Sequence, residues 1–154
     1  MDNNLDGIDN KIIDLLIKDS RMSFAEIGRL VNLSRVSVRE RVNRLIESGV
    51  IERFSIIINP KMVGLNLSVF FEIDVHPHKL QEVAKTLAEN QYVLSVNQMT
   101  GPSTLHAHVA LRDNQHLQTF LINTVYSLPG ISSVNSRVLL RGFKPKIGGV
   151  RIGI

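Results

Sequence analysis

Residues 23–49, SFAEIGRLVNLSRVSVRERVNRLIESG, decide the fold, because they carry two helix signatures separated by a short turn. Ser23 and Glu26 have the spacing of a capping box, in which each side chain binds the other residue's backbone N–H. The first helix is predicted to end at Asn32, a residue type that tolerates the left-handed backbone found at helix ends. We expect it to bury Phe24, Ile27, Leu30 and Val31.

A second helix is predicted to begin after Ser34, its N-cap, and to stop at Gly49. Its inward side chains are predicted to be Val38, Val42, Leu45 and Ile46. Two short helices joined by a turn of three or four residues form a helix-turn-helix, whose second helix fits the major groove of DNA. The residues predicted to contact DNA are Ser34, Arg35, Val36, Ser37, Arg39, Glu40, Arg41, Asn43 and Arg44.

The arginines concentrated around this helix favour a surface that faces phosphates, which carry no sequence information themselves. Outward polar side chains can reach base edges, and we assign Arg44 to guanine, Asn43 to adenine and Glu40 to a cytosine amino group as hypotheses. Contacts to phosphate or water are the alternatives for each of the three. On charge alone, a solvated helix face explains the same arginines.

The segments on either side complete the domain. Residues 6–18 are predicted to form a helix capped by Asp6, with Asp9 near the positive end of the dipole and Ile8, Ile12, Leu15 and Leu16 in one stripe. After Gly49 the period changes to two, and residues 53–59, RFSIIIN, are predicted to form a strand. An isolated strand exposes its edges, so a second copy of the chain is its natural partner.

Residues 65–142 are predicted to follow the order β-α-β-β-α-β, which is typical of a ferredoxin-like fold. The four strands are expected at residues 67–75, 92–99, 104–111 and 131–140. Helices usually cover one face of such a sheet. We expect the other face to be apolar enough to accept a partner sheet, through Val69, Phe71 and Ile73.

Composition excludes several classes of protein. The 154 residues include no cysteine, so neither a disulfide framework nor a cysteine-based zinc site is possible. The acidic start lacks the pattern of a secretory signal, and no apolar run approaches the roughly 18 residues of a membrane span. We therefore expect a cytoplasmic protein with no membrane association and no cofactor.

No enzyme signature is present either. Ser103 and His106 are close in sequence, but nothing indicates a nucleophile turn or oxyanion donors. His106 and His108 are two apart on a predicted strand and share one side, so they could bind a metal with His76 or His78, or make assembly sensitive to pH. A surface or pairing role is the more common explanation of this spacing, and we predict no metal site.

Together these residues resemble the Lrp/AsnC family, the leucine-responsive and asparagine-related regulators, over nearly the whole chain. The resemblance is carried by Leu5 to Asp9, Asp19 to Arg21, Glu26 and Ile27, Val31 to Ser34, Glu40 to Val42, Ser48 to Ile51, Asn59 and Pro60, Thr100 and Gly101, Leu128 to Ile131, and Val138 to Leu140. It implies sequence-specific DNA binding, dimerisation through the C-terminal sheets with a hinge strand between the domains, further assembly to octamers, and an amino-acid effector.

The resemblance also places the effector near the turn between the second and third strands of the C-terminal domain. The corresponding residues here are Thr100, Gly101, Pro102, Ser103 and Thr104. The family usually has an aspartate where this chain has Thr104. A carboxylate binds an ammonium more strongly than a hydroxyl does, so this departure puts the effector in question.

The sequence therefore predicts an α+β protein. Residues 1–51 form a three-helix, winged helix-turn-helix domain, and residues 52–64 form a hinge strand and linker. Residues 65–142 form a ferredoxin-like domain that pairs into a dimeric α/β sandwich or barrel, and residues 143–154 form a basic tail. The predicted function is sequence-specific transcriptional regulation through double-stranded DNA, responsive to an amino acid or a related small molecule and linked to amino-acid metabolism or transport. The alternatives are a dimeric α+β barrel enzyme, a metal-binding protein using the histidine-bearing sheet, and a largely nonspecific architectural DNA-binding protein.

Overall fold

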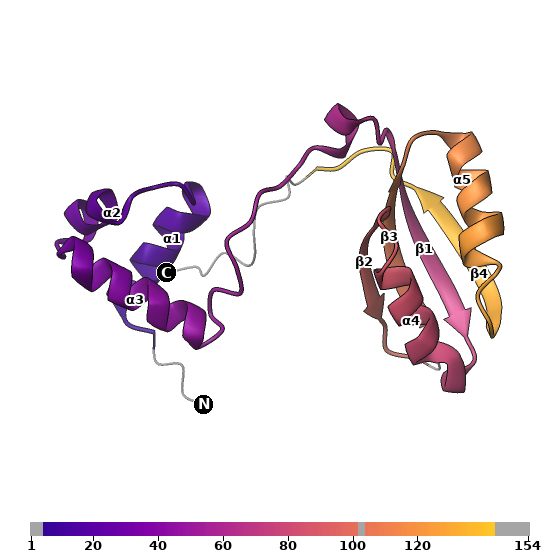
Figure 1. Ribbon diagram of the computed structural model, residues 1–154, viewed down its shortest axis with the longest axis horizontal. Coiled ribbons are helices and arrows are strands. Elements are labelled where there is room, and N and C mark those ends of the chain that lie inside the picture. Colours follow the sequence, from indigo (N-terminus) through magenta and orange to yellow (C-terminus); the bar gives the residue numbers. More distant parts are fainter. Residues whose placement is uncertain (1–4, 102–103, 144–154) are drawn as a thin grey trace. The chain divides into compact units, whose positions relative to one another are not determined.

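The computed structural model describes residues 5–101 and 104–143, and the predicted basic tail lies outside these ranges from residue 144 onward. The described chain divides into two compact units, with the boundary between Ile57 and Ile58. The first unit holds α1, α2 and α3, and the second holds the sheet with α4 and α5 (Figure 1). Among the described residues, no helix combines the length and the apolar character that crossing a membrane requires.

The first unit consists of α1 (Gly7–Lys18), α2 (Phe24–Val31) and α3 (Arg35–Glu47). The caps predicted from the sequence are present: Asp6 and Ser23 each complete a capping box, and the Ser34 side chain accepts from the backbone N–H of Ser37. Asn32 ends α2 in the left-handed region, with φ of 56°. The resulting core consists of Ile12, Leu16, Ile27, Val31, Val38 and Val42.

Two side chains predicted to be buried in this unit are exposed. Leu30 on α2 is 61% exposed and Ile46 on α3 is 40% exposed. Gly28 of α2 is buried against the following turn, where an added Cβ would lie 2.5 Å from the carbonyl oxygen of Leu33. Because this close approach turns the side bearing Ile27, Gly28 and Val31 inward, Leu30 is rotated toward solvent.

The strand predicted at residues 53–59 is absent from the structure. A strand exists only where a neighbour completes its hydrogen-bond ladder, and the sheet formed by the described residues contains only β1 to β4. As a result, Phe54, Ile56, Ile57 and Ile58 remain exposed. The 3-10 helix η1 (Pro60–Val63) follows directly, capped by the Asn59 side chain.

The second unit contains β1 (Leu67–Val75), α4 (Leu80–Ala88), β2 (Val93–Gln98), β3 (Thr104–Leu111), α5 (Asn114–Phe120) and β4 (Ile131–Val138). The short 3-10 helix η2 (Pro77–Lys79) precedes α4, and the π-helical turn η3 (Leu121–Val125) continues α5. The strands form one open antiparallel sheet in the order β2-β3-β1-β4. The predicted ferredoxin-like order is confirmed, although β2 and β4 are shorter than expected.

The prediction that Val69, Phe71 and Ile73 face away from the helices is wrong. These side chains are at most 2% exposed and form the core beneath Leu80, Val83, Leu87 and Phe120. The strand alternates apolar and polar residues, so it has one apolar face, and the apolar helix faces occupy it. The opposite side, here called the open face, carries Ser68, Phe70, Glu72, Asp74, Ser95, Asn97, Thr104, His106, His108, Ser133, Asn135 and Arg137.

Candidate nucleic-acid interface

The helix-turn-helix geometry is fixed by the residues between α2 and α3. Asn32 reverses the chain in the left-handed region, and the backbone N–H of Leu33 donates to the carbonyl of Gly28 over 2.9 Å. The hydroxyl of Ser34 then accepts from the backbone N–H of Ser37 at 3.0 Å and lies 2.9 Å from the Ser37 hydroxyl. These contacts set the angle at which α3 leaves the turn.

Six of the predicted DNA-contacting side chains are exposed along α3. Five of them form no ion pair with a described residue and make up what we call the α3 surface: Arg35, Val36, Arg39, Glu40 and Asn43. Arg35 and Arg39 form no ion pair with any described residue, so both guanidinium groups are available to phosphates. Val36 is 53% exposed and presents a branched apolar surface of the kind that contacts a thymine methyl group. The α3 surface thus combines free cations with groups that can contact base edges.

The other predicted contacts have partners within the protein. Ser34 and Ser37 are engaged in the cap described above. Arg41 and Arg44 lie on the side of α3 that faces α1, where both bind the carboxylate of Asp9. The assignment of Arg44 to guanine therefore competes with an existing ion pair, whereas Asn43 and Glu40 are exposed as the sequence predicts.

This charge cluster was not anticipated from the sequence. Asp9 is 1% exposed and accepts from Arg41 Nη1 at 2.8 Å and Arg44 Nη2 at 2.7 Å. Arg41 Nη1 also donates to Asp6 Oδ2 over 2.6 Å. The signal was available: Asp9 precedes Ile12, Ile13 and Leu16 by three, four and seven residues, so it occupies a buried position of the α1 stripe. A carboxylate there needs cationic partners.

The pKa values around this cluster shift in the directions that its contacts require. The backbone N–H of Asp9, and then the guanidinium of Arg41, lower the pKa of the Asp6 carboxyl below its usual value. Hydrogen bonds to Asp6 and then to Asp9 raise the pKa of Arg41. Both groups are therefore charged throughout the physiological pH range.

The turn predicted to bind an effector is only partly described. Thr100 and Gly101 are exposed between β2 and β3, Gly101 has φ of 133°, and Pro102 and Ser103 lie outside the described residues. Thr104 begins β3 and donates from its hydroxyl to Asp74 Oδ1 at 2.7 Å. The predicted site thus adjoins a carboxylate on the neighbouring strand.

Asp74 is held between two strands at this end of the sheet. It pairs in register with Thr104 on β3 and with Ser133 on β4, and the Ser133 hydroxyl donates to Asp74 Oδ2 at 2.6 Å. The hydrogen bonds from Ser133 and then Thr104 lower the pKa of the Asp74 carboxyl. Ser133 also borders a hollow of about 320 Å³ lined by Tyr126, Leu128, Gly130, Ile131, Ser132 and Val134. Asp74 is therefore an anion beside a partly polar recess.

The histidines do not converge. His106 and His108 share the open face, where His108 Nε2 lies 2.6 Å from the Ser68 hydroxyl and its ring stacks on Phe70 at 4.2 Å. His76 and His78 stack on each other just beyond the end of β1. Within residues 5–101 and 104–143, no three histidine, aspartate or glutamate side chains form a group that could hold a metal ion.

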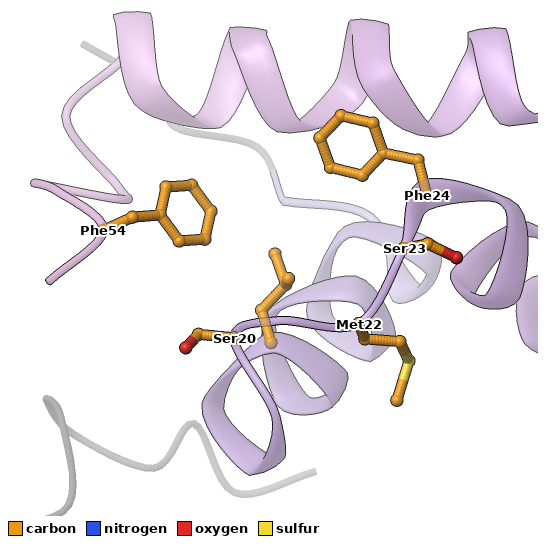
Figure 2. Close-up of a pocket in the computed structure, with 6 residues that line it drawn as sticks. Ser20, Met22, Ser23, Phe24 and Phe54 are labelled. Atoms are coloured by element: carbon orange, nitrogen blue, oxygen red, sulfur yellow. The ribbon is translucent and has the colours of Figure 1, made fainter. Parts of the chain in front are cut away.

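A second hollow, of about 370 Å³, lies in the three-helix unit and is lined by Leu16, Ser20, Met22, Ser23, Phe24 and Phe54. Figure 2 shows the rings of Phe24 and Phe54 facing the hollow from opposite sides. Its lining is mostly apolar and includes no charged side chain, so it offers little to a polar ligand. Phe54, from the segment after α3, therefore lines an apolar hollow together with Leu16 of α1 and Phe24 of α2.

Comparison with known proteins covers both units. Residues 5–46 match the model of the AsnC-type helix-turn-helix domain, and residues 68–147 match that of the Lrp/AsnC ligand binding domain. An uncharacterized HTH-type transcriptional regulator of Pyrococcus abyssi is 38% identical over 135 residues, which cover 88% of this chain and 85% of the relative. The HTH-type transcriptional regulator LrpA of the same organism is 34% identical over 140 residues, covering 91% and 99%.

Solved structures share the fold. AsnC of Escherichia coli superposes with a TM-score of 0.84 at 22% identity, covering 92% of this chain and 95% of that one. A transcriptional regulator of Neisseria meningitidis, solved as a complex with L-Met, superposes with a TM-score of 0.85 at 24% identity, covering 92% and 93%. Both likenesses extend through the helical unit and the sheet.

Proposed function

This chain belongs to the Lrp/AsnC family of DNA-binding transcriptional regulators, and from that premise we propose that α3 reads a specific duplex sequence in the major groove. The observation that carries the proposal is the α3 surface, where Arg35 and Arg39 are exposed and unpaired among the described residues, beside Val36 and Asn43. Free guanidinium groups attract phosphates, and the residues between them contact base edges.

We further propose that the chain works as a homodimer that assembles to an octamer. Residues 53–59 leave four large apolar side chains exposed, and the open face offers a second surface to another copy. Two copies related by a two-fold axis would place their α3 helices in successive major grooves, about 10 base pairs apart or a multiple of that. The target site is accordingly a near-palindrome.

Selection of duplexes from a randomised pool by the full-length protein tests sequence specificity. The expected result is an enriched near-palindromic sequence that binds more tightly than a scrambled duplex of the same length at the same salt concentration. Equal affinity for the two duplexes would instead favour a largely nonspecific architectural protein.

Arg39→Ala is expected to weaken binding to the selected and the scrambled duplex alike, because an unpaired arginine on α3 contacts phosphate. The plot of log affinity against log salt concentration should lose about one unit of slope per contact removed. Lys85→Ala, which removes an exposed cation from α4 in the other unit, is the matched control and should leave the slope unchanged. An unchanged slope for Arg39→Ala would remove this residue from the interface.

We propose that the second unit binds an α-amino acid at Thr100, Gly101, Pro102, Ser103 and Thr104. The match of residues 68–147 to the Lrp/AsnC ligand binding domain supports a ligand site in the second unit. The Neisseria meningitidis regulator solved with L-Met supports an amino acid as the class of ligand. Although Thr104 stands where the family usually has an acid, Asp74 supplies a carboxylate 2.7 Å from its hydroxyl. In this proposal Asp74 binds the ammonium group in place of the missing acid.

Asp74→Asn is expected to weaken amino-acid binding by tenfold or more, since a hydrogen bond to a charged group contributes about 1.5 to 3 kcal/mol. Melting temperature, recorded with each of the standard amino acids, identifies the ligand, and titration calorimetry measures its affinity for both variants. Glu89→Gln removes an exposed carboxylate at the end of α4 and is the control. The effector proposal fails if no amino acid shifts the melting temperature of the unmodified protein.

We propose that the protein acts in the cytoplasm by binding, without catalysing a reaction. Several polar side chains of the open face are bound to one another: Ser68 with His108, Asp74 with Thr104 and Ser133, and Arg137 with Glu72 at 3.6 Å. An active site of the dimeric barrel type would need convergent groups free to meet a substrate.

A further inference from the structure

We propose that Asp9 is a positioning residue of the DNA interface: by binding Arg41 and Arg44 it fixes the rotation of α3 about its own axis. The proposal rests on the proposed function, because it concerns which side chains of α3 face the duplex. It also assigns Arg41, a predicted DNA contact, to an ion-pair cluster within the protein.

The contacts around Asp9 use both of its carboxylate oxygens. Oδ1 accepts from Arg41 Nη1 at 2.8 Å, and Oδ2 accepts from Arg44 Nη2 at 2.7 Å. Oδ2 also accepts from the backbone N–H of Asp6 over 3.3 Å, while the Asp6 carboxylate binds Arg41. Asp9 is 1% exposed, so the group is held on α1 away from water.

The Asp9 contacts control the rotation of α3 because of where the two arginines lie on this helix. Arg41 and Arg44 are three residues apart and therefore lie one above the other on the same side of α3. The apolar contacts of Val38, Val42 and Leu45 hold α3 against its neighbours, but such contacts have little directional preference. Hydrogen bonds between charged groups are directional. Two of them on successive turns of α3 therefore fix how far the helix is rotated about its own axis.

The same contacts withdraw Arg41 from DNA. Its side chain is 24% exposed and bridges Asp6 and Asp9, whereas Arg35 and Arg39 form no ion pair with a described residue. If Arg41 turned to a phosphate, the buried Asp9 carboxylate would lose one of its two cations, which is strongly unfavourable. Arg44 is 59% exposed and can still approach the duplex while it binds Asp9.

The test is Asp9→Asn in the full-length protein, with binding measured on the duplex selected by the unmodified protein and on its scrambled counterpart. The ratio of the two affinities is expected to fall about tenfold or more, the equivalent of losing at least one base-pair contact. The salt slope on the scrambled duplex should not fall, because the phosphate contacts through Arg35 and Arg39 remain. Asp14→Asn, also on α1 but outside the cluster, is the control and should keep the full ratio.

Arg41→Gln gives an independent result that does not depend on how Asp9→Asn folds. If Arg41 is internal, its replacement lowers the affinity ratio and leaves the salt slope unchanged, unlike Arg39→Ala. A slope reduced by about one unit would make Arg41 a phosphate contact and overturn the proposal. A full affinity ratio in folded Asp9→Asn would also overturn it. If the unmodified protein prefers no duplex, the proposed function itself fails, and that outcome is visible before any variant is made.

Discussion

Gly28→Ala is expected to abolish the folded helix-turn-helix and, with it, all DNA binding. An alanine Cβ at this position would lie 2.5 Å from the carbonyl oxygen of Leu33, a backbone atom that no side-chain rotation can move. The Leu33 N–H already donates to the Gly28 carbonyl at 2.9 Å, so relief requires α2 and α3 to separate. Overpacking costs about 1 to 3 kcal/mol even where side chains can adjust. Here the backbone must shift, so we expect a larger loss in the free energy of unfolding.

Thermal melting followed by circular dichroism, with gel-shift binding to the selected duplex, measures the effect. Gly7→Ala is the matched control, because an alanine Cβ there meets no heavy atom within 4 Å and the residue begins a helix of the same unit. That control should keep its melting temperature and its DNA affinity. A Gly28→Ala variant that melts like the control would show that the turn tolerates a wider separation of α2 and α3.

Phe71→Ala is expected to destabilise the second unit by about 3 to 5 kcal/mol, the cost of removing a large aromatic side chain from a packed core. Phe71 is 2% exposed, and its ring stacks on Phe120 at a centroid distance of 5.9 Å. Urea denaturation measures the free energy of unfolding of the second unit. The three-helix unit has a separate core, so its transition should remain where it is in the unmodified protein.

The adjacent Phe70 provides the control, because it belongs to the opposite face of β1 and is 44% exposed. Phe70→Ala removes the same number of atoms but leaves no buried cavity, and its effect on the unfolding of the isolated chain should be well under half that of Phe71→Ala. Equal losses would mean that the open face is covered and contributes as much as the core.

The helices and their ends were predictable because their determinants are local. The capping boxes at Asp6 and Ser23 each involve residues three apart, and the end at Asn32 depends on the conformation of a single residue. The order of strands and helices in the second unit followed in the same way from the change in apolar period. Most of the fold could therefore be predicted from residues that are close together in the sequence.

The features that could not be predicted from the sequence depend on contacts between residues that are distant in the chain. Residues 53–59 have the composition of a strand, but within the described residues no neighbour completes their ladder. Periodicity identifies the apolar face of β1 but not what covers it, so the prediction that this face accepts a partner sheet is wrong. Likewise, the ion pairs of Asp9 join residues more than thirty positions apart, and only the packing of α1 against α3 brings them together.

The two hydrophobic cores have no residue in common, and the α3 surface belongs to neither of them. Substitutions of exposed residues such as Val36 or Asn43 generally change stability by no more than about 0.5 kcal/mol. A duplicated gene could therefore diverge in the DNA sequence that its product binds by altering a few surface positions, while the core of the second unit stayed the same. The second unit can likewise change without disturbing the core of the three-helix unit, so the two halves of the protein can evolve one at a time.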